Sequence, residues 1–131
     1  MSKGYEENQE RLRLLSLLGK PLARRSKRRC ELCESTGNEL RPYEIPPAPK
    51  EPAIENTLLL CSACMEQLKA PRKMDPARWR PLESAIWSSE AAVQIVAARL
   101  LRRMKDIPWA MEALEAVGLD EEIEARIAEK S

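Results

Sequence analysis

Four cysteines are the residues of this chain best suited to chemistry, and they fall into two pairs with the same spacing. Two residues separate Cys30 from Cys33, two separate Cys61 from Cys64, and residues 34–60 lie between the pairs. A Cys-x-x-Cys turn can place two sulfur atoms on one ion, and two such turns complete a closed tetrahedral zinc site. Because the chain has no other cysteine, the pattern predicts one structural Zn²⁺ held by these four side chains.

Two other uses of the cysteines stay open. A redox dithiol needs one reactive pair, usually on a βαβ pattern of the thioredoxin type, and the sequence does not show that pattern. Iron or an iron–sulfur cluster also accepts four thiolates, although its usual spacings differ. The spacing therefore favours zinc over iron without deciding between them.

The chain contains no histidine, which argues against hydrolytic and nucleolytic metal sites. Such sites need a base and an open position on the metal. Tyrosine has a pKa of about 10 and a lone carboxylate is a poor site for a hydrated ion, so Tyr43 and Glu44 do not replace a histidine. We expect Tyr43 to pack on the first cysteine turn and Glu44 to pair with Arg41 or Arg80. No catalytic residue is predicted, and we expect a protein that is not an enzyme.

The formal net charge of +1 conceals blocks of opposite sign. Segment 20–29 is basic and holds no acidic residue, whereas the chain from Asp120 onward is acidic. The simplest interpretation is two solvated ends that pair with each other. The alternative is a basic segment that binds the phosphates of a nucleic acid; its candidate residues are Lys20, Arg24, Arg25, Lys27, Arg28 and Arg29. A protein partner is also compatible with the pattern, and the oligomeric state is not indicated.

Two tryptophans and three arginines of the second half are interpreted as structural. Trp79 and Trp87 have the rings that stack on nucleobases in single-strand binders. We nevertheless expect both in the core, where they would join the two halves of the chain. Arg99, Arg102 and Arg103 are expected to form a solvated helix face.

The sequence shows neither a membrane-spanning run nor a secretory signal. No run approaches the roughly 20 apolar residues that cross a bilayer. The first residues mix acids and bases and lack the pattern of a secretory signal. We therefore expect a cytoplasmic protein with no membrane partner, in a compartment where reduced thiols favour metal over disulfide.

Hydrophobic periodicity and the turn residues give the expected elements. In the first half these are helices over 6–18 and 21–27, strands over 39–45 and 57–60, a proline-rich loop between the strands, and a short helix between Cys61 and Pro71. In the second half they are a helix start at Asp75 and Pro76, a helix from Ser88 or Ser89 to about Lys105, a helix between Pro108 and Gly118, and a last helix capped by Asp120.

The resulting fold class is α+β, with a small treble-clef or zinc-ribbon module that contains a β-hairpin. Helices surround this module, and a helical half follows it. The predicted segments are an N-terminal helical basic arm over 1–28, a four-cysteine zinc-binding module over 29–71 and a helical C-terminal region over 72–131. Residues 30–64 include five prolines and few large apolar side chains. Since zinc contributes on the order of 10 kcal/mol to small fingers, we expect the module to be disordered without metal.

The order of these motifs resembles two families. A Cys-x-x-Cys pair, a strand and a second pair at a helix start are similar to the treble clef of HNH nucleases, but residues 43–46 hold no histidine where that family has its base. The resemblance to the PhnA family of small bacterial zinc-ribbon proteins is closer and spans about residues 22–125. It rests on segments 30–33, 43–47, 60–64, 75–80, 84–88, 92–97 and 107–109.

The PhnA resemblance implies a non-enzymatic zinc-binding protein with a role in interaction or regulation. The family is historically labelled as alkylphosphonate utilisation, so an enzyme or accessory protein of phosphonate metabolism is an alternative. Many members continue into a small β-rich domain, and residues 106–131 show no strand periodicity. Nucleic-acid binding through segment 20–29 is the other alternative.

Overall fold

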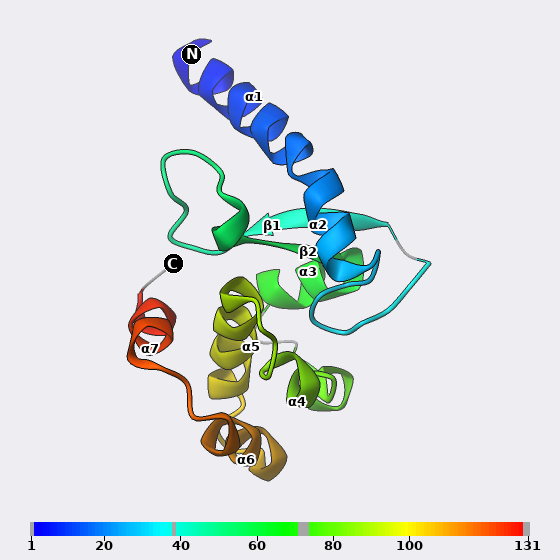
Figure 1. The fold of residues 1–131 in the computed structure, drawn as a ribbon, viewed down its shortest axis with the longest axis vertical. Coiled ribbons are helices and arrows are strands. Elements are labelled where there is room, and N and C mark those ends of the chain that lie inside the picture. Colours follow the sequence, from blue (N-terminus) through cyan, green and yellow to red (C-terminus); the bar gives the residue numbers. More distant parts are fainter. Residues whose placement is uncertain (1, 38, 71–73, 130–131) are drawn as a thin grey trace.

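The computed structural model describes residues 2–37, 39–70 and 74–129 as a helical protein with one two-stranded sheet (Figure 1). The elements in chain order are α1 (Ser2–Leu17), α2 (Gly19–Ser26), β1 (Leu40–Glu44), the 3₁₀ turn η1 (Ile54–Asn56), β2 (Thr57–Cys61), α3 (Ser62–Lys69), the 3₁₀ turn η3 (Pro76–Trp79), α4 (Leu82–Ala85), α5 (Ala91–Arg103), α6 (Pro108–Val117) and α7 (Glu121–Ala128). The mixed fold class predicted from the sequence is confirmed.

The hairpin is antiparallel, and its register runs from Leu40 opposite Cys61 to Glu44 opposite Thr57. Every residue of β2 is buried, as expected for a short continuous apolar run. The strand predictions are therefore correct to within one residue at each end. Pro42 is tolerated in β1 because each strand of a two-stranded sheet is an edge strand.

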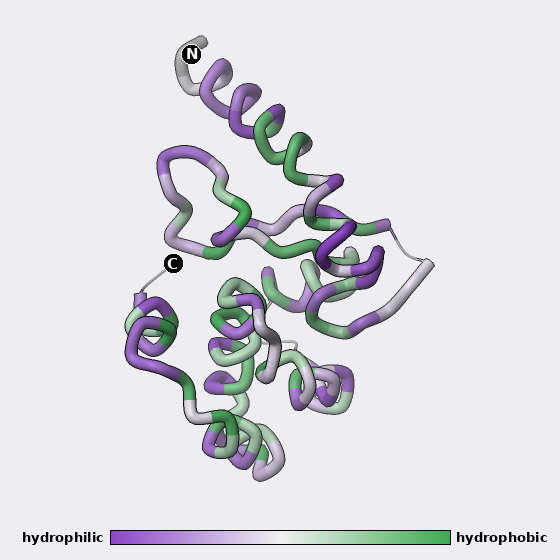
Figure 2. The backbone as a smooth tube through the Cα atoms, in the orientation of Figure 1, coloured by the Kyte–Doolittle hydropathy of each residue, from purple (hydrophilic) through white to green (hydrophobic). Residues whose placement is uncertain are grey.

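A single hydrophobic core joins the sheet to the helical half. Helix α5 lies at its centre and contacts β2, α4, α6 and α7 (Figure 1). The same cluster of buried residues includes Leu58 and Leu60 of β2, Trp79 of η3 and Ile95 of α5. Figure 2 shows hydrophobic residues along β2 and hydrophilic residues in the first turns of α1. The predicted segments 29–71 and 72–131 thus share one core.

Several helix boundaries follow the predicted caps. The Asp75 carboxylate accepts from Ala77 N at 3.1 Å at the start of η3. The Asp120 carboxylate accepts from Ile123 N at 2.9 Å at the start of α7. Helix α6 begins at Pro108, and Gly118 follows its last turn with a φ of 58°, a left-handed conformation that glycine adopts without strain. The predicted stop at Pro71 lies outside the described residues.

The predicted serine cap of α5 is wrong. Glu90 occupies the N-cap position without a capping side-chain bond, and the helix ends at Arg103. Ser88 Oγ instead accepts from Glu90 N at 3.0 Å, one residue before the helix. The Glu90 carboxylate lies 3.5 Å from the Arg25 guanidinium, so a tertiary ion pair places the residue where a local cap was expected.

The two tryptophans differ. Trp79 is fully buried, as predicted, and its Nε1 donates to Gln67 Oε1 at 3.1 Å. Trp87 is 59 % exposed, so its predicted core position is wrong. Ile86, which precedes it, is fully buried at the end of α4 and takes the inward position of this turn.

The predicted solvated arginine face of α5 is only partly correct. Arg103 is exposed, and Arg102 pairs with Glu124 of α7. Arg99 is not solvated: its guanidinium donates to backbone carbonyls of the loop after β1 and of the end of α7. The packing of α7 against α5, which the local sequence does not reveal, creates these partners.

Helix α1 starts earlier than predicted and extends away from the rest of the protein (Figure 1). Leu12 and Leu17 are exposed on it. Arg11 forms a bidentate pair with Glu44, at 2.8 Å from Nε and 2.6 Å from Nη2. The predicted pairing of Glu44 with Arg41 or Arg80 is therefore wrong. Its partner is Arg11 of α1, a helix that is distant in sequence but lies beside the end of β1. Among the described residues, no helix has the length and apolar character to span a bilayer.

Candidate metal centre

The first cysteine pair sits in a tight turn. Cys30 N donates to Ser35 O at 3.1 Å, and Glu34 N donates to Cys30 O at 2.9 Å. Glu34 has a φ of 64°, which lets the chain reverse after Cys33. Glu31 N donates to Leu59 O at 2.9 Å, so this turn is fastened to the middle of β2.

The second pair lies where β2 becomes α3. Cys61 ends the strand and is the N-cap residue of the helix, and Cys64 lies in its first turn. The amide groups at a helix start carry partial positive charge, which favours thiolate over thiol. The turn 30–35 is held against β2, so the two pairs face each other.

The structure brings the four predicted ligands together. Their Sγ atoms all lie within 4.8 Å of one another. Cys30 Sγ is 3.6 Å from Cys64 Sγ, and Cys33 Sγ is 3.7 Å from Cys61 Sγ. A disulfide has an S–S distance of about 2.05 Å, whereas a tetrahedron with zinc–sulfur bonds of about 2.3 Å has edges of about 3.8 Å. The donor set and its spacing fit a tetrahedral metal ion.

The electrostatics of the cluster also fit a cation. The hydrogen bond between Cys30 and Cys64 lowers the pKa of Cys30. The same bond, burial and the neighbouring sulfurs raise the pKa of Cys64, and burial raises the pKa of Cys33. Cys33 and Cys64 therefore resist ionising beside Cys30. A divalent cation removes this repulsion, which is why thiolate sites release protons when metal binds.

Arg78 faces the cluster, and the sequence did not single it out. Its Nη2 donates to Cys64 Sγ at 3.4 Å and to Cys61 Sγ at 3.8 Å. Its Nε is buried without a hydrogen-bond partner in the part of the chain that the structure describes. Burial opposes its charge, but the sulfurs of Cys64, Cys33 and Cys61 outweigh burial and raise the pKa of Arg78. A guanidinium binds a thiolate more strongly than a neutral thiol, since hydrogen bonds between charged groups are the stronger ones.

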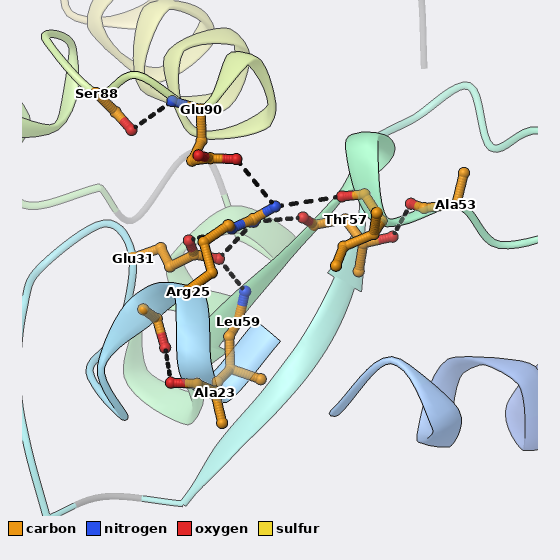
Figure 3. A network of polar contacts seen from close by, with 10 residues as sticks. Ala23, Arg25, Glu31, Ala53, Thr57, Leu59, Ser88 and Glu90 are labelled. Carbon is orange, nitrogen blue, oxygen red and sulfur yellow. Dashed lines mark hydrogen bonds and ion pairs between the residues drawn. The ribbon is translucent and has the colours of Figure 1, made fainter. Parts of the chain in front are cut away.

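A second arginine, Arg25, stabilises the turn that carries Cys30 and Cys33 by binding Glu31 between them. Arg25 Nε and Nη2 donate to the two carboxylate oxygens of Glu31 at 2.9 and 2.8 Å (Figure 3). Arg25 Nη2 also donates to Thr57 O at 2.9 Å, and Glu31 Oε1 accepts from Leu59 N at 2.8 Å. The side chains of this pair are only 16 % and 6 % exposed. The network connects α2, the cysteine turn and β2.

Arg25 is thereby removed from the predicted nucleic-acid interface. The remaining cations of segment 20–29 are exposed and have no ion pair within the described residues; they are Lys20, Arg24, Lys27, Arg28 and Arg29. Helix α2 ends in two consecutive left-handed residues, with φ of 58° at Lys27 and 61° at Arg28. This turn leads directly to Cys30, so the basic segment borders the candidate metal centre.

Tyr43 and Glu44 do not form a second metal site. Glu44 is neutralised by Arg11. Tyr43 packs on the core and lines a cavity with Arg99 and Arg103, and burial raises its pKa. The cysteine group is the one cluster of candidate ligands in the ranges 2–37, 39–70 and 74–129.

Comparisons of the chain with protein-family models, with curated proteins and with solved structures found no match.

Arg78→Met should weaken metal binding. Removal of groups that hydrogen-bond to metal ligands typically costs 10–100-fold in affinity, and we expect a loss of about tenfold because one thiolate-directed cation disappears. Competition with a chromophoric chelator would measure it. Lys69→Met, which removes an exposed cation from α3, is the matched control. Equal affinities of the two variants would contradict the role given to Arg78.

Arg25→Met should destabilise the metal-loaded protein by about 3–5 kcal/mol, because it leaves the Glu31 carboxylate buried without its partner. Urea unfolding would give the difference. Arg13 pairs with Glu10 on the surface, with both side chains more than half exposed, so Arg13→Met should change stability by less than about 0.5 kcal/mol. Similar losses in both variants would show that burial of the Arg25 pair is unimportant.

Proposed function

We propose that this chain is a non-enzymatic zinc-binding protein in which one structural Zn²⁺ is held by Cys30, Cys33, Cys61 and Cys64. The observation that carries the proposal is the convergence of four sulfur atoms within 4.8 Å. Four protein ligands leave no open position, and zinc supplies a cross-link without redox chemistry. We further propose that the cysteine turn, the hairpin and α3 together form a treble clef, and that the chain is of the PhnA type, as its sequence motifs suggest.

A structural role is favoured by where the ligands lie. Cys30, Cys61 and Cys64 belong to the same buried cluster as the apolar residues of α5. An ion at this point joins the turn before β1 to the start of α3, and it does so inside the core. Loss of the ion would leave mutually repelling sulfurs in an apolar environment, which is costly. The role of the whole protein would then be an interaction or regulation that uses the surface supported by this centre.

Elemental analysis and chelation test this proposal. Native protein should contain about one zinc per chain, the stoichiometry of a site with four cysteine ligands. A strong chelator should lower the unfolding temperature, because binding of metal to the folded state stabilises it by mass action. Cys61→Ser should reduce zinc content and produce the same loss, whereas Ser62→Ala, an exposed neighbour, should not.

Three results would oppose the zinc assignment. Iron in the elemental analysis, with visible absorption, would replace zinc by an iron site. If metal-free protein unfolds at the same temperature as native protein, the fold does not depend on a metal ion. Full metal content in the Cys61→Ser variant would place the ion elsewhere.

Nucleic-acid binding is a second candidate, favoured by the exposed cations of segment 20–29. Five side chains, those of Lys20, Arg24, Lys27, Arg28 and Arg29, remain unpaired within the described residues and lie on α2 and the turn after it. Arg25 does not belong to this surface because Glu31 holds it. Such a patch binds phosphates electrostatically and without regard to sequence.

Salt dependence tests this candidate. Binding of labelled single-stranded and duplex oligonucleotides should weaken as salt rises from about 50 to 200 mM, with a logarithmic slope of about −0.7 to −0.9 for each phosphate contact. Replacing Arg24, Arg28 and Arg29 by Glu should abolish it. The matched control replaces three exposed cations elsewhere, Arg41, Lys69 and Lys105. Binding that survives the first set as well as the second would exclude this surface.

A role in phosphonate metabolism, as an enzyme or an accessory protein, is supported only by the PhnA resemblance. The four-cysteine arrangement holds no open metal position, so it offers no catalytic step to such a reaction. Turnover of a phosphonate by zinc-loaded protein would be needed to support an enzymatic role in phosphonate metabolism.

A further inference from the structure

A cavity of about 580 Å³ lies between β1, α3, α5 and α7, away from the cysteines. Its volume falls within the range of small-molecule sites, roughly 300–1,000 Å³. Arg99, Arg102 and Arg103 line it together with Tyr43. Neither the cysteine site nor the basic segment 20–29 uses any of these residues.

Arg99 places a positive charge beside the cavity, and no ion pair within the described residues neutralises it. Its guanidinium donates to four backbone carbonyls, at 2.5 Å for Pro46 O, 2.7 Å for Arg126 O, 3.0 Å for Glu129 O and 3.2 Å for Ile127 O. It has no carboxylate partner within the described ranges. Carbonyls at the end of α7 offset part of this charge but carry none of their own. Burial lowers the pKa of Arg99; Tyr43 and Glu129 oppose this shift in part, and the neighbouring Arg126 and Arg103 add to it.

Two polar groups in the cavity remain available for a ligand. Arg103 is exposed and has no ion pair or hydrogen bond to any described residue. The Tyr43 hydroxyl likewise has no partner there and is not sealed from solvent. Arg102 already pairs with Glu124, and Glu129 is the acidic residue of the lining. The balance of charge around the cavity is therefore positive.

The rest of the lining is apolar. Leu68 of α3, Val96 and Leu100 of α5 and Ile127 of α7 form it together with Pro46. An inorganic ion would leave these surfaces exposed to water, whereas an apolar body attached to an anionic group would cover them.

We propose that this cavity binds a small organic oxyanion, with Arg103 and Tyr43 donating to its charged oxygens and the apolar lining holding its body. Arg99 acts as a positioning residue, because it connects α5 to α7 and to the loop after β1 while adding positive potential. Carboxylate and phosphate share the required chemistry, since a guanidinium binds either through two parallel hydrogen bonds. This site is independent of the zinc proposal.

Calorimetric titration of metal-loaded protein would test the site with phenyl phosphate, benzoate and inorganic phosphate. One of the two aromatic anions should bind saturably, and the tighter of them identifies the preferred head group. Inorganic phosphate should bind more weakly than phenyl phosphate, because it does not cover the apolar lining.

Variants locate the binding. Arg103→Gln should weaken it by about tenfold or more, and Tyr43→Phe by a smaller factor, because a charged donor contributes more than a neutral one. Both variants should fold like the original protein, since Arg103 is exposed and phenylalanine keeps the aromatic ring of Tyr43. Lys105→Gln removes an exposed cation that does not line the cavity and should leave affinity unchanged.

Three outcomes would overturn the proposal. The first is no binding of any of these anions at millimolar concentration. The second is an unchanged affinity in Arg103→Gln. The third is equal affinity for inorganic and phenyl phosphate, which would remove the apolar half of the site.

Discussion

The gathering of four sulfurs in one buried place is the constraint on which the rest of this structure depends. Thiolates this close repel one another, and burial makes the repulsion stronger because it removes the screening of water. Three sources of positive charge reduce that repulsion: the amide groups at the start of α3, the guanidinium of Arg78, and the divalent ion that we propose. Arg78 is informative because it has no other polar partner among the described residues. A cation placed in this way shows that the surroundings suit negative sulfur.

The cysteine site is part of the protein core and not a separate appendage. Cys30, Cys61 and Cys64 lie in the same buried cluster as Trp79 and the inward face of α5. A short hairpin alone is at best marginally stable in water, so β1 and β2 depend on the sulfur centre and on the helices packed against them. Disturbance at the metal site therefore reaches the helical half through directly packed side chains.

Arginine supplies much of the long-range order. Arg11 holds the carboxylate of Glu44, 33 residues along the chain, and Arg25 joins Glu31 to Thr57 O of β2. Arg99 ties together carbonyls from two segments. A planar guanidinium with five donors suits this use, because it can satisfy several acceptors from different elements at once. The cations without an ion pair within the described parts of the chain include five in segment 20–29 and Arg103, and these are available to partners and ligands.

Sequence alone determined the four candidate ligands, the hairpin strands and most helix ends. Cysteine spacing, proline, glycine and aspartate act over a few residues, so their geometry is local and can be read in order. Tertiary structure decided what depended on packing between distant segments: the inward turn of Trp79 and outward turn of Trp87, the partner of Glu44, and the approach of Arg78 to the sulfurs. Long charged side chains reach many acceptors, and only the folded arrangement of helices selects one. The cavity beside Arg99 belongs to that second group, because four elements must meet before it exists.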